Sequence, residues 1–223
     1  MTAIASHPTD RLPVPGTPSS RPDDSAIDLD AIALGARLRE LRLARGLSLR
    51  SLATRLDISP SAVSQLERGA RRPSVSRLLT IVQVLEVPLA DVFATGASAA
   101  PGGTVAAPPR SVVVQRADES RPVVLGGGVV FRRLSPGHLR GVDFFESTYP
   151  PGASATGVND LVTHEGYEVG TVVSGELTIE FPDERIVVRA GDSVTFPCDL
   201  PHRLGNRGDI DAVATWLIVH PGA

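Results

Sequence analysis

The segment "LDISPSAVSQLERG", Leu56–Gly69, decides the fold of the first half of the chain. Ser59 followed by Pro60 favours a helix start, because serine caps a helix and proline fits its first position. Val63 and Leu66 are spaced i, i+3, so they share one side of that helix, which ends at the final glycine. Only three residues separate it from the preceding helical segment. This spacing predicts a helix-turn-helix unit.

Apolar periodicity and helix punctuation on both sides of this unit predict an all-α domain over residues 31–94. Five helices are expected: residues 31–44, one starting at Ser48, one starting at Ser59, one starting near Ser74, and a short one that holds Leu89, Val92 and Phe93.

The side of the Ser59 helix opposite Val63 and Leu66 carries small polar residues, which allow close approach to the floor of a major groove. Gln65 can pair with a base edge such as the N6/N7 edge of adenine. Arginines in and after the helix can neutralise phosphates. The residues predicted to contact DNA are Arg50, Ser59, Ser61, Ala62, Ser64, Gln65, Arg68, Arg71 and Arg72.

From Leu34 to Val87 the chain resembles the Cro/C1-type repressor domain of the xenobiotic-response-element (XRE) family, with "SPSAVSQLERG" as the specific signature. The resemblance implies a double-stranded DNA operator and, because such operators are symmetric, a homodimer. Leu49 stands where many members carry a Gln that braces a phosphate, so Arg50 is expected to supply that contact. The alternative is a helical bundle for dimerisation, but its outer face would be apolar.

Charge divides the 223-residue chain into two unlike halves. Residues 31–94 hold ten Arg against five acidic residues, whereas residues 111–223 hold nine against fifteen. A basic and an acidic half indicate two domains with different partners, the first a polyanion. The absence of Lys excludes Schiff-base chemistry. A single cysteine, Cys198, and the lack of a signal peptide or long apolar run predict a cytoplasmic protein that is nucleoid-associated when bound to DNA and has no membrane partner.

Composition marks two segments without a core of their own: a Pro- and Asp-rich tail at residues 1–30, predicted to be disordered, and a flexible linker at residues 95–110. Residues 111–223 alternate β-branched runs with Gly, Pro and Asp turns, which predicts an all-β sandwich or barrel. The runs are "SVVVQR", "GVVFRR", "TVVSGELTIEF" and "RIVVRAGDSVTF".

Two histidines and a glutamate are placed to converge inside this barrel. Val162, His164 and Glu168 share a face if they lie on one strand, and His202 falls on a later strand. Two His and one carboxylate form a ligand set that suits Fe(II), Mn(II) or a related ion. Cys198 nearby is expected to be a buried, inert thiol rather than a ligand or redox sensor.

Two motifs in this region resemble those of the cupin superfamily, which implies a double-stranded β-helix, or jelly-roll barrel. The first motif is matched by His164, Glu168 and Gly175, with Val162 at the position of its first His; the second is matched by Gly191, Pro197, His202 and Asn206, with Asp199 where Gly is usual. The resemblance implies a site for Fe, Mn, Ni or Zn at His164, Glu168 and His202. The predicted effector cavity comprises Val162, His164, Tyr167, Glu168, Phe196 and His202. With one ligand missing, the two His are either ion ligands or hydrogen-bonded cavity walls.

The pair of domains resembles the helix-turn-helix/cupin transcriptional regulators. This resemblance implies that a small-molecule effector binds the cupin domain and changes operator affinity, with no catalytic residue. The alternative is a metal-dependent cupin oxidoreductase similar to the phosphonate epoxidases, in which the helical domain is accessory. The intact "SAVSQLERG" face and the linker favour the regulator.

Overall fold

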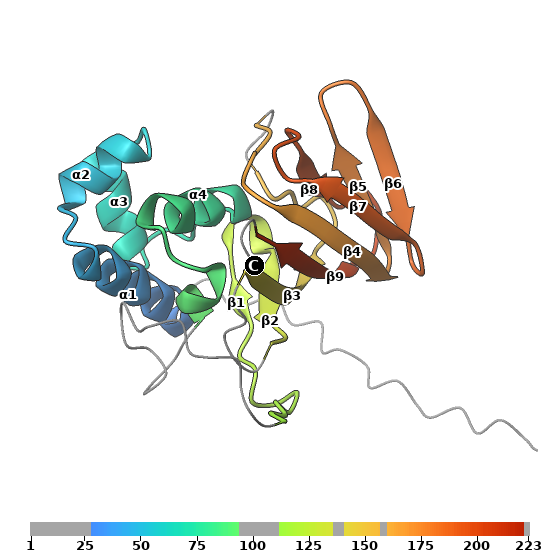
Figure 1. Ribbon diagram of the computed structural model, residues 1–223, viewed down its shortest axis with the longest axis horizontal. Coiled ribbons are helices and arrows are strands. Elements are labelled where there is room, and N and C mark those ends of the chain that lie inside the picture. The colour runs from blue at the N-terminus through green and yellow to red at the C-terminus, as the bar shows by residue number, and fades with distance from the viewer. Residues whose placement is uncertain (1–27, 94–111, 136–140, 157–159, 221–223) are drawn as a thin grey trace, which may run out of the picture.

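A computed structural model describes residues 28–93, 112–135, 141–156 and 160–220. Helices form the first half and strands the second, and the two halves pack against each other (Figure 1). Residues 1–27 of the predicted tail, and the whole predicted linker, lie outside the described residues. The predicted tail extended too far, because the first helix already begins at Leu29, where Asp28 accepts a hydrogen bond from the Ala31 N–H.

The helical domain contains four α-helices and one 3₁₀-helix within the described residues. They are α1 (Leu29–Ala44), α2 (Leu49–Arg55), α3 (Pro60–Glu67), α4 (Val75–Leu85) and η1 (Leu89–Phe93). Ser48 and Ser59 cap α2 and α3 as predicted, each accepting a hydrogen bond from the N–H three residues ahead. The fifth predicted helix is corrected to a 3₁₀ turn, the form that such short helical pieces commonly take.

Close contacts with α1 hold α3 in place. Val63 and Leu66 are buried, as their spacing predicts. A Cβ on Gly35 of α1 would lie 2.5 Å from the Leu66 carbonyl oxygen, so only glycine lets the two backbones approach this closely. Arg42 of α1 donates to both carboxylate oxygens of Glu67, with Nη2 at 2.9 Å from Oε2. The position of α3 is therefore set by backbone packing and by a buried ion pair.

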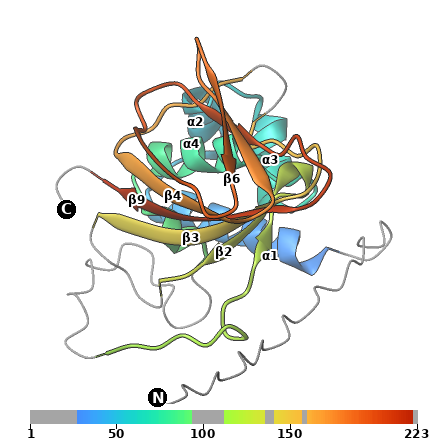
Figure 2. The same cartoon turned by 90° about the vertical axis from the view of Figure 1, so that its right-hand side faces the viewer.

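The second half forms two antiparallel sheets, as predicted for a jelly-roll (Figures 1 and 2). The strands are β1 (Val123–Val124), β2 (Val130–Arg133), β3 (Val142–Tyr149), β4 (Tyr167–Ser174), β5 (Glu176–Glu180), β6 (Arg185–Arg189), β7 (Ser193–Pro197), β8 (Arg203–Gly205) and β9 (Ala212–Val219). The six-stranded sheet has the order β1-β2-β3-β9-β4-β7, and the three-stranded sheet has the order β6-β5-β8. In the run "SVVVQR" the prediction of a strand is wrong for Val112 to Val114, which are exposed and pair with no strand among the described residues.

Two of the motif residues have clear structural roles at the turns of the barrel. Gly175 joins β4 to β5 at a φ of 70°, and a Cβ there would meet the Asp211 carbonyl at 2.5 Å. The buried Asn206 donates to the carbonyls of Tyr149 and Ile210, each at 2.7 Å. These two positions therefore stabilise the turns and the closed barrel.

One continuous hydrophobic core runs from the helices into the space between the sheets. It includes Leu78 and Leu85 of α4 together with Phe131, Tyr149 and Trp216 of the barrel. No helix among the described residues is both long and apolar enough to cross a membrane.

Candidate functional site

The outer face of α3 has the character that DNA reading requires. Ser61 and Arg68 are exposed, and Ala62, Ser64 and Gln65 are half-buried. Arg50 of α2 and Arg71 beyond α3 are exposed beside this helix in the chain. The face is small and polar at the helix and cationic at its margins, as contact with base edges and phosphates demands.

Two of the residues predicted to contact DNA have structural roles in the free protein. Ser59 caps α3 through its hydroxyl oxygen, which accepts from the Ala62 N–H at 3.1 Å. Arg72 pairs with Asp28, with Nε at 2.7 Å from Oδ2. Hydrogen bonds from Ala31 and Arg72 hold the pKa of Asp28 below its ordinary value. A phosphate contact by Arg72 would therefore compete with its ion pair to Asp28.

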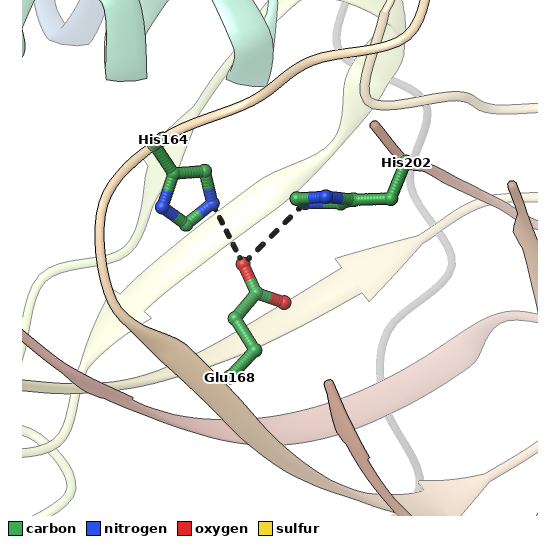
Figure 3. Close-up of side chains that lie close together, drawn as sticks. All are labelled: His164, Glu168 and His202. Atoms are coloured by element: carbon green, nitrogen blue, oxygen red, sulfur yellow. Dashed lines mark hydrogen bonds and ion pairs between the residues drawn. The ribbon is translucent and has the colours of Figure 1, made fainter. Parts of the chain in front are cut away.

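In the barrel, His164, Glu168 and His202 converge as predicted (Figure 3). Their nearest ligand atoms all lie within 4.8 Å of one another. His164 Nε2 is 3.1 Å and His202 Nε2 is 3.8 Å from the same carboxylate oxygen, Glu168 Oε1. Glu168 comes from β4, whereas His164 precedes that strand and His202 lies directly before β8. A two-residue bridge between Val162 and His202 closes this end of the barrel.

Each imidazole has Nδ1 near a backbone carbonyl and Nε2 near the Glu168 carboxylate. His202 Nδ1 lies 2.8 Å from the Leu200 carbonyl, and His164 Nδ1 lies 3.3 Å from the Glu165 carbonyl. A carbonyl only accepts, so Nδ1 of neutral His202 carries the proton and its Nε2 keeps a lone pair. The shorter contact of His164 is the 3.1 Å one from Nε2 to Glu168, and a carboxylate also only accepts, so Nε2 of His164 donates to Glu168. Burial lowers the pKa of His202 and so favours its neutral form. Two imidazole nitrogens that converge on one carboxylate form a donor set that fits a divalent cation, for which His164 would give up the proton on Nε2.

A cavity adjoins Glu168 and His202, and its lining differs from the predicted set. It is lined by Val75, Leu79, Phe131, Phe145, Tyr149, Ala155, Val162, Glu168, His202, Leu204, Trp216 and Ile218. Tyr167 is corrected to the outer face of β4, where it is 58% exposed, because it directly precedes the inward Glu168 and side chains alternate along a strand. Phe196 is buried behind His202, with the ring centroids 4.9 Å apart.

The predicted effector cavity did not include the aromatic residues of this lining or the residues from α4. Alternation along β2, β3 and β9 predicts that Phe131, Phe145 and Trp216 face inward, but it does not separate a cavity wall from ordinary core. Val75 and Leu79 belong to the other domain and show the periodicity of any helix core. Their contribution depends on how the domains pack.

Cys198 is fully buried, and burial raises the pKa of its thiol to about 12. A thiol that is neutral and shielded from solvent is a poor nucleophile and a poor ligand, which agrees with the predicted inert role.

Comparison with known protein families identifies the helical domain and the barrel domain separately. A helix-turn-helix family model matches residues 38–92, and a cupin domain model matches residues 145–218. Together these ranges cover more than half of the 223 residues.

The similarity to curated proteins extends across both domains. The HTH-type transcriptional regulator PuuR of Escherichia coli is 27% identical over 179 residues, covering 79% of this chain and 89% of PuuR. The HTH-type transcriptional regulator RamB of Mycobacterium tuberculosis is 44% identical over 54 residues, 24% of this chain and 11% of RamB. The crystal structure of an HTH_3 family transcriptional regulator from Vibrio cholerae has the same fold, with a TM-score of 0.61, 22% identity and coverage of 86% of this chain and 98% of that one. The chain belongs to the transcriptional regulators that join a helix-turn-helix domain to a cupin domain.

Proposed function

We propose that this regulator reads a double-stranded DNA operator with α3 and senses a small-molecule effector in its cupin cavity. The observation that carries the first part is the division of α3 into two faces. Val63 and Leu66 are buried against the domain, while Ser61 and Arg68 are open to solvent. Gln65 lies between them on the open side and is the residue best suited to a base edge. A protein that acts on DNA in this way works in the cytoplasm, on the nucleoid.

Replacing Gln65 by alanine is expected to weaken binding to the preferred operator by about 1–3 kcal/mol and to relax specificity at one base pair. Arg71→Ala is expected to weaken binding to all sequences evenly and to reduce the slope of log K against log salt by about one. The affinities of both variants, and their dependence on salt, are measured by fluorescence anisotropy on duplexes selected from a randomised library. Arg189→Ala, an exposed arginine on β6, is the control. Unchanged affinity and specificity in Gln65→Ala would show that α3 is not the reader.

We propose further that the protein is a homodimer that associates through the outer face of the six-stranded sheet. On this face the register of β3, β9 and β4 aligns two apolar rows: Val142–Val219–Tyr167 and Phe144–Leu217–Val169. Phe144, Tyr167 and Val169 are 37%, 58% and 41% exposed. A contiguous apolar patch of this kind is typical of a protein interface, and a symmetric operator requires two copies of α3.

Val169→Asp is expected to convert the dimer to a monomer, because it places a charge in the second apolar row. Analytical ultracentrifugation gives the mass directly. Val187→Asp on β6 is the matched control, since Val187 is 39% exposed against 41% for Val169 but belongs to the other sheet. If Val169→Asp sediments like the unsubstituted chain, the dimer uses another surface.

The proposed sensor site consists of the cavity and the three residues beside it. His164, Glu168 and His202 would hold a divalent ion, Fe, Mn, Ni or Zn, through two imidazole nitrogens and a carboxylate oxygen. When bound, the ion would supply a Lewis-acidic point for a polar group of the effector. The rest of the lining is largely aromatic and aliphatic, which suits the apolar part of a small molecule.

The same three-residue cluster supports a second candidate, a metal-dependent cupin oxidoreductase. Oxygen uptake is measured in air with Fe(II) and a panel of phosphonates. Substrate-dependent uptake that His164→Ala abolishes would establish an enzyme. A regulator is expected to consume no oxygen above the level of Fe(II) alone.

A further inference from the structure

The cupin cavity has one wall that belongs to the DNA-binding domain. Helix α4 lies next to the barrel, with α2 and α3 on its far side (Figure 1). Val75 and Leu79 of α4 line the cavity together with Glu168 and His202 of the barrel. The proposed effector site is therefore completed by the helical domain and is not contained within the cupin domain.

The cavity is small. Its volume is about 20 Å³, which is room for about one or two water molecules. An ion held by the three converging side chains needs little more than this. An organic molecule of several non-hydrogen atoms does not fit unless one of the walls moves.

The walls differ in how firmly they are held. Three barrel walls come from β3, β9 and β4, which form unbroken antiparallel ladders over most of their length. The α4 wall is held by apolar packing and by hydrogen bonds between the domains. Ser76 N–H donates to the Ala155 carbonyl at 3.0 Å, and Gly126 N–H donates to the Pro73 carbonyl at 2.7 Å. Moving α4 breaks a few such bonds, whereas moving a strand breaks a ladder.

A third connection lies beside η1, on the same side of the barrel. Ala90 N–H donates to the buried carboxylate of Asp143 at 3.3 Å, and Arg133 donates to the Ala90 carbonyl at 3.4 Å. Both distances are long for hydrogen bonds, and the connection is reinforced by the attraction between Arg133 and Asp91 of η1. The boundary between the domains therefore has fewer hydrogen bonds than the ladders between β3, β9 and β4.

We infer that α4 is the movable wall of the cupin cavity, and that an organic ligand in the cavity and the docked position of the helical domain exclude each other. This inference rests on the proposed effector site. Ser61 and Arg68 on the outer face of α3 are already exposed in the docked state, so the proposed ligand does not act by uncovering them. The ligand instead frees the helical domain from a fixed position on the barrel, which changes the spacing of the two α3 helices in a dimer. The ligand class is a small, largely apolar molecule with one polar group that reaches Glu168 and His202.

The test fills the cavity with a larger side chain introduced by substitution. It then measures, in the full chain, whether the helical domain stays docked on the barrel. Val162→Phe adds a ring from the barrel side, and residue-resolved hydrogen exchange by NMR follows the Ser76, Gly126 and Ala90 amides. These three amides are expected to exchange at least about tenfold faster, while amides bonded within one domain keep their rates. Leu161→Phe is the matched control, because Leu161 is adjacent in the chain but 37% exposed, and it is expected to change none of them.

Leu79→Trp repeats the test from the α4 side, with the exposed Gln83→Trp as its control, in case Val162→Phe does not fold. A folded Val162→Phe or Leu79→Trp protein whose three interdomain amides stay protected as in the unsubstituted chain would overturn the inference. Exchange is measured without DNA, so its outcome does not depend on whether Gln65→Ala affects operator binding.

Discussion

Replacing Glu67 by alanine is expected to lower the free energy of unfolding of the helical domain by about 3–5 kcal/mol, because Arg42 is left buried without a counter-charge. The two side chains are only 7% and 6% exposed. Two guanidinium nitrogens of Arg42 bind the carboxylate, and Nη1 donates to the Leu47 carbonyl at 2.7 Å. The hydrogen bond to Glu67 also raises the pKa of Arg42, so the arginine stays charged. Loss of Glu67 therefore leaves a buried cation with one remaining partner.

This effect bears on function because Glu67 is the last residue of α3 and Arg42 is in α1. Urea unfolding followed by far-UV circular dichroism measures the free energy. Glu40→Ala is the control: Glu40 pairs with Arg37 but is 59% exposed, so a loss below about 1 kcal/mol is expected. The double substitution Arg42→Met with Glu67→Met is expected to recover most of the stability, since it removes both charges. A loss below 1 kcal/mol in Glu67→Ala would contradict the assigned role of the pair.

Replacing His202 by alanine is expected to weaken divalent ion binding by about 100-fold or more. Loss of a residue that only orients a ligand costs about 10–100-fold, and His202 is one of three direct ligands. Its backbone bridge to Val162 does not depend on the side chain, so the barrel is expected to fold. Glu168→Gln keeps the side-chain shape and removes the charge, and a similar loss is expected.

The affinity and stoichiometry are measured by isothermal titration calorimetry with Mn(II) and Zn(II). The metal content of protein purified without chelator is determined as well. His220→Ala is the control, since His220 pairs with Asp143 at 2.9 Å, outside the cluster. One ion per chain in the unsubstituted protein, and none in His202→Ala, is the expected result. Equal binding by both proteins would show that the ion binds at another site. No binding by either protein would show that the two histidines line the cavity without binding an ion.

Most of the fold was predictable because its signals are local. A serine before a proline caps α3 through its own hydroxyl, and the i, i+3 spacing of Val63 and Leu66 decides which side is buried. The three metal-type residues were also predictable, since two motifs in register place His164, Glu168 and His202 at one end of a barrel. The fifth helix is only five residues long, too short for its periodicity to separate an α-helix from a 3₁₀-helix. Val112–Val114 have strand-like composition but are exposed and lie outside every strand of the described residues.

The sequence by itself determined two domains, a polar reading face on α3 and a converging set of two histidines and a glutamate. Capping, periodicity and strand alternation act over a few residues, so they are visible in the chain. Only the tertiary structure decided that Arg72 is bound to Asp28, that Tyr167 faces outward and that α4 completes the cavity. Val75 and Trp216 meet in that lining although 141 positions separate them in the chain. Such a contact depends on how two folded domains dock, and no local pattern carries that information.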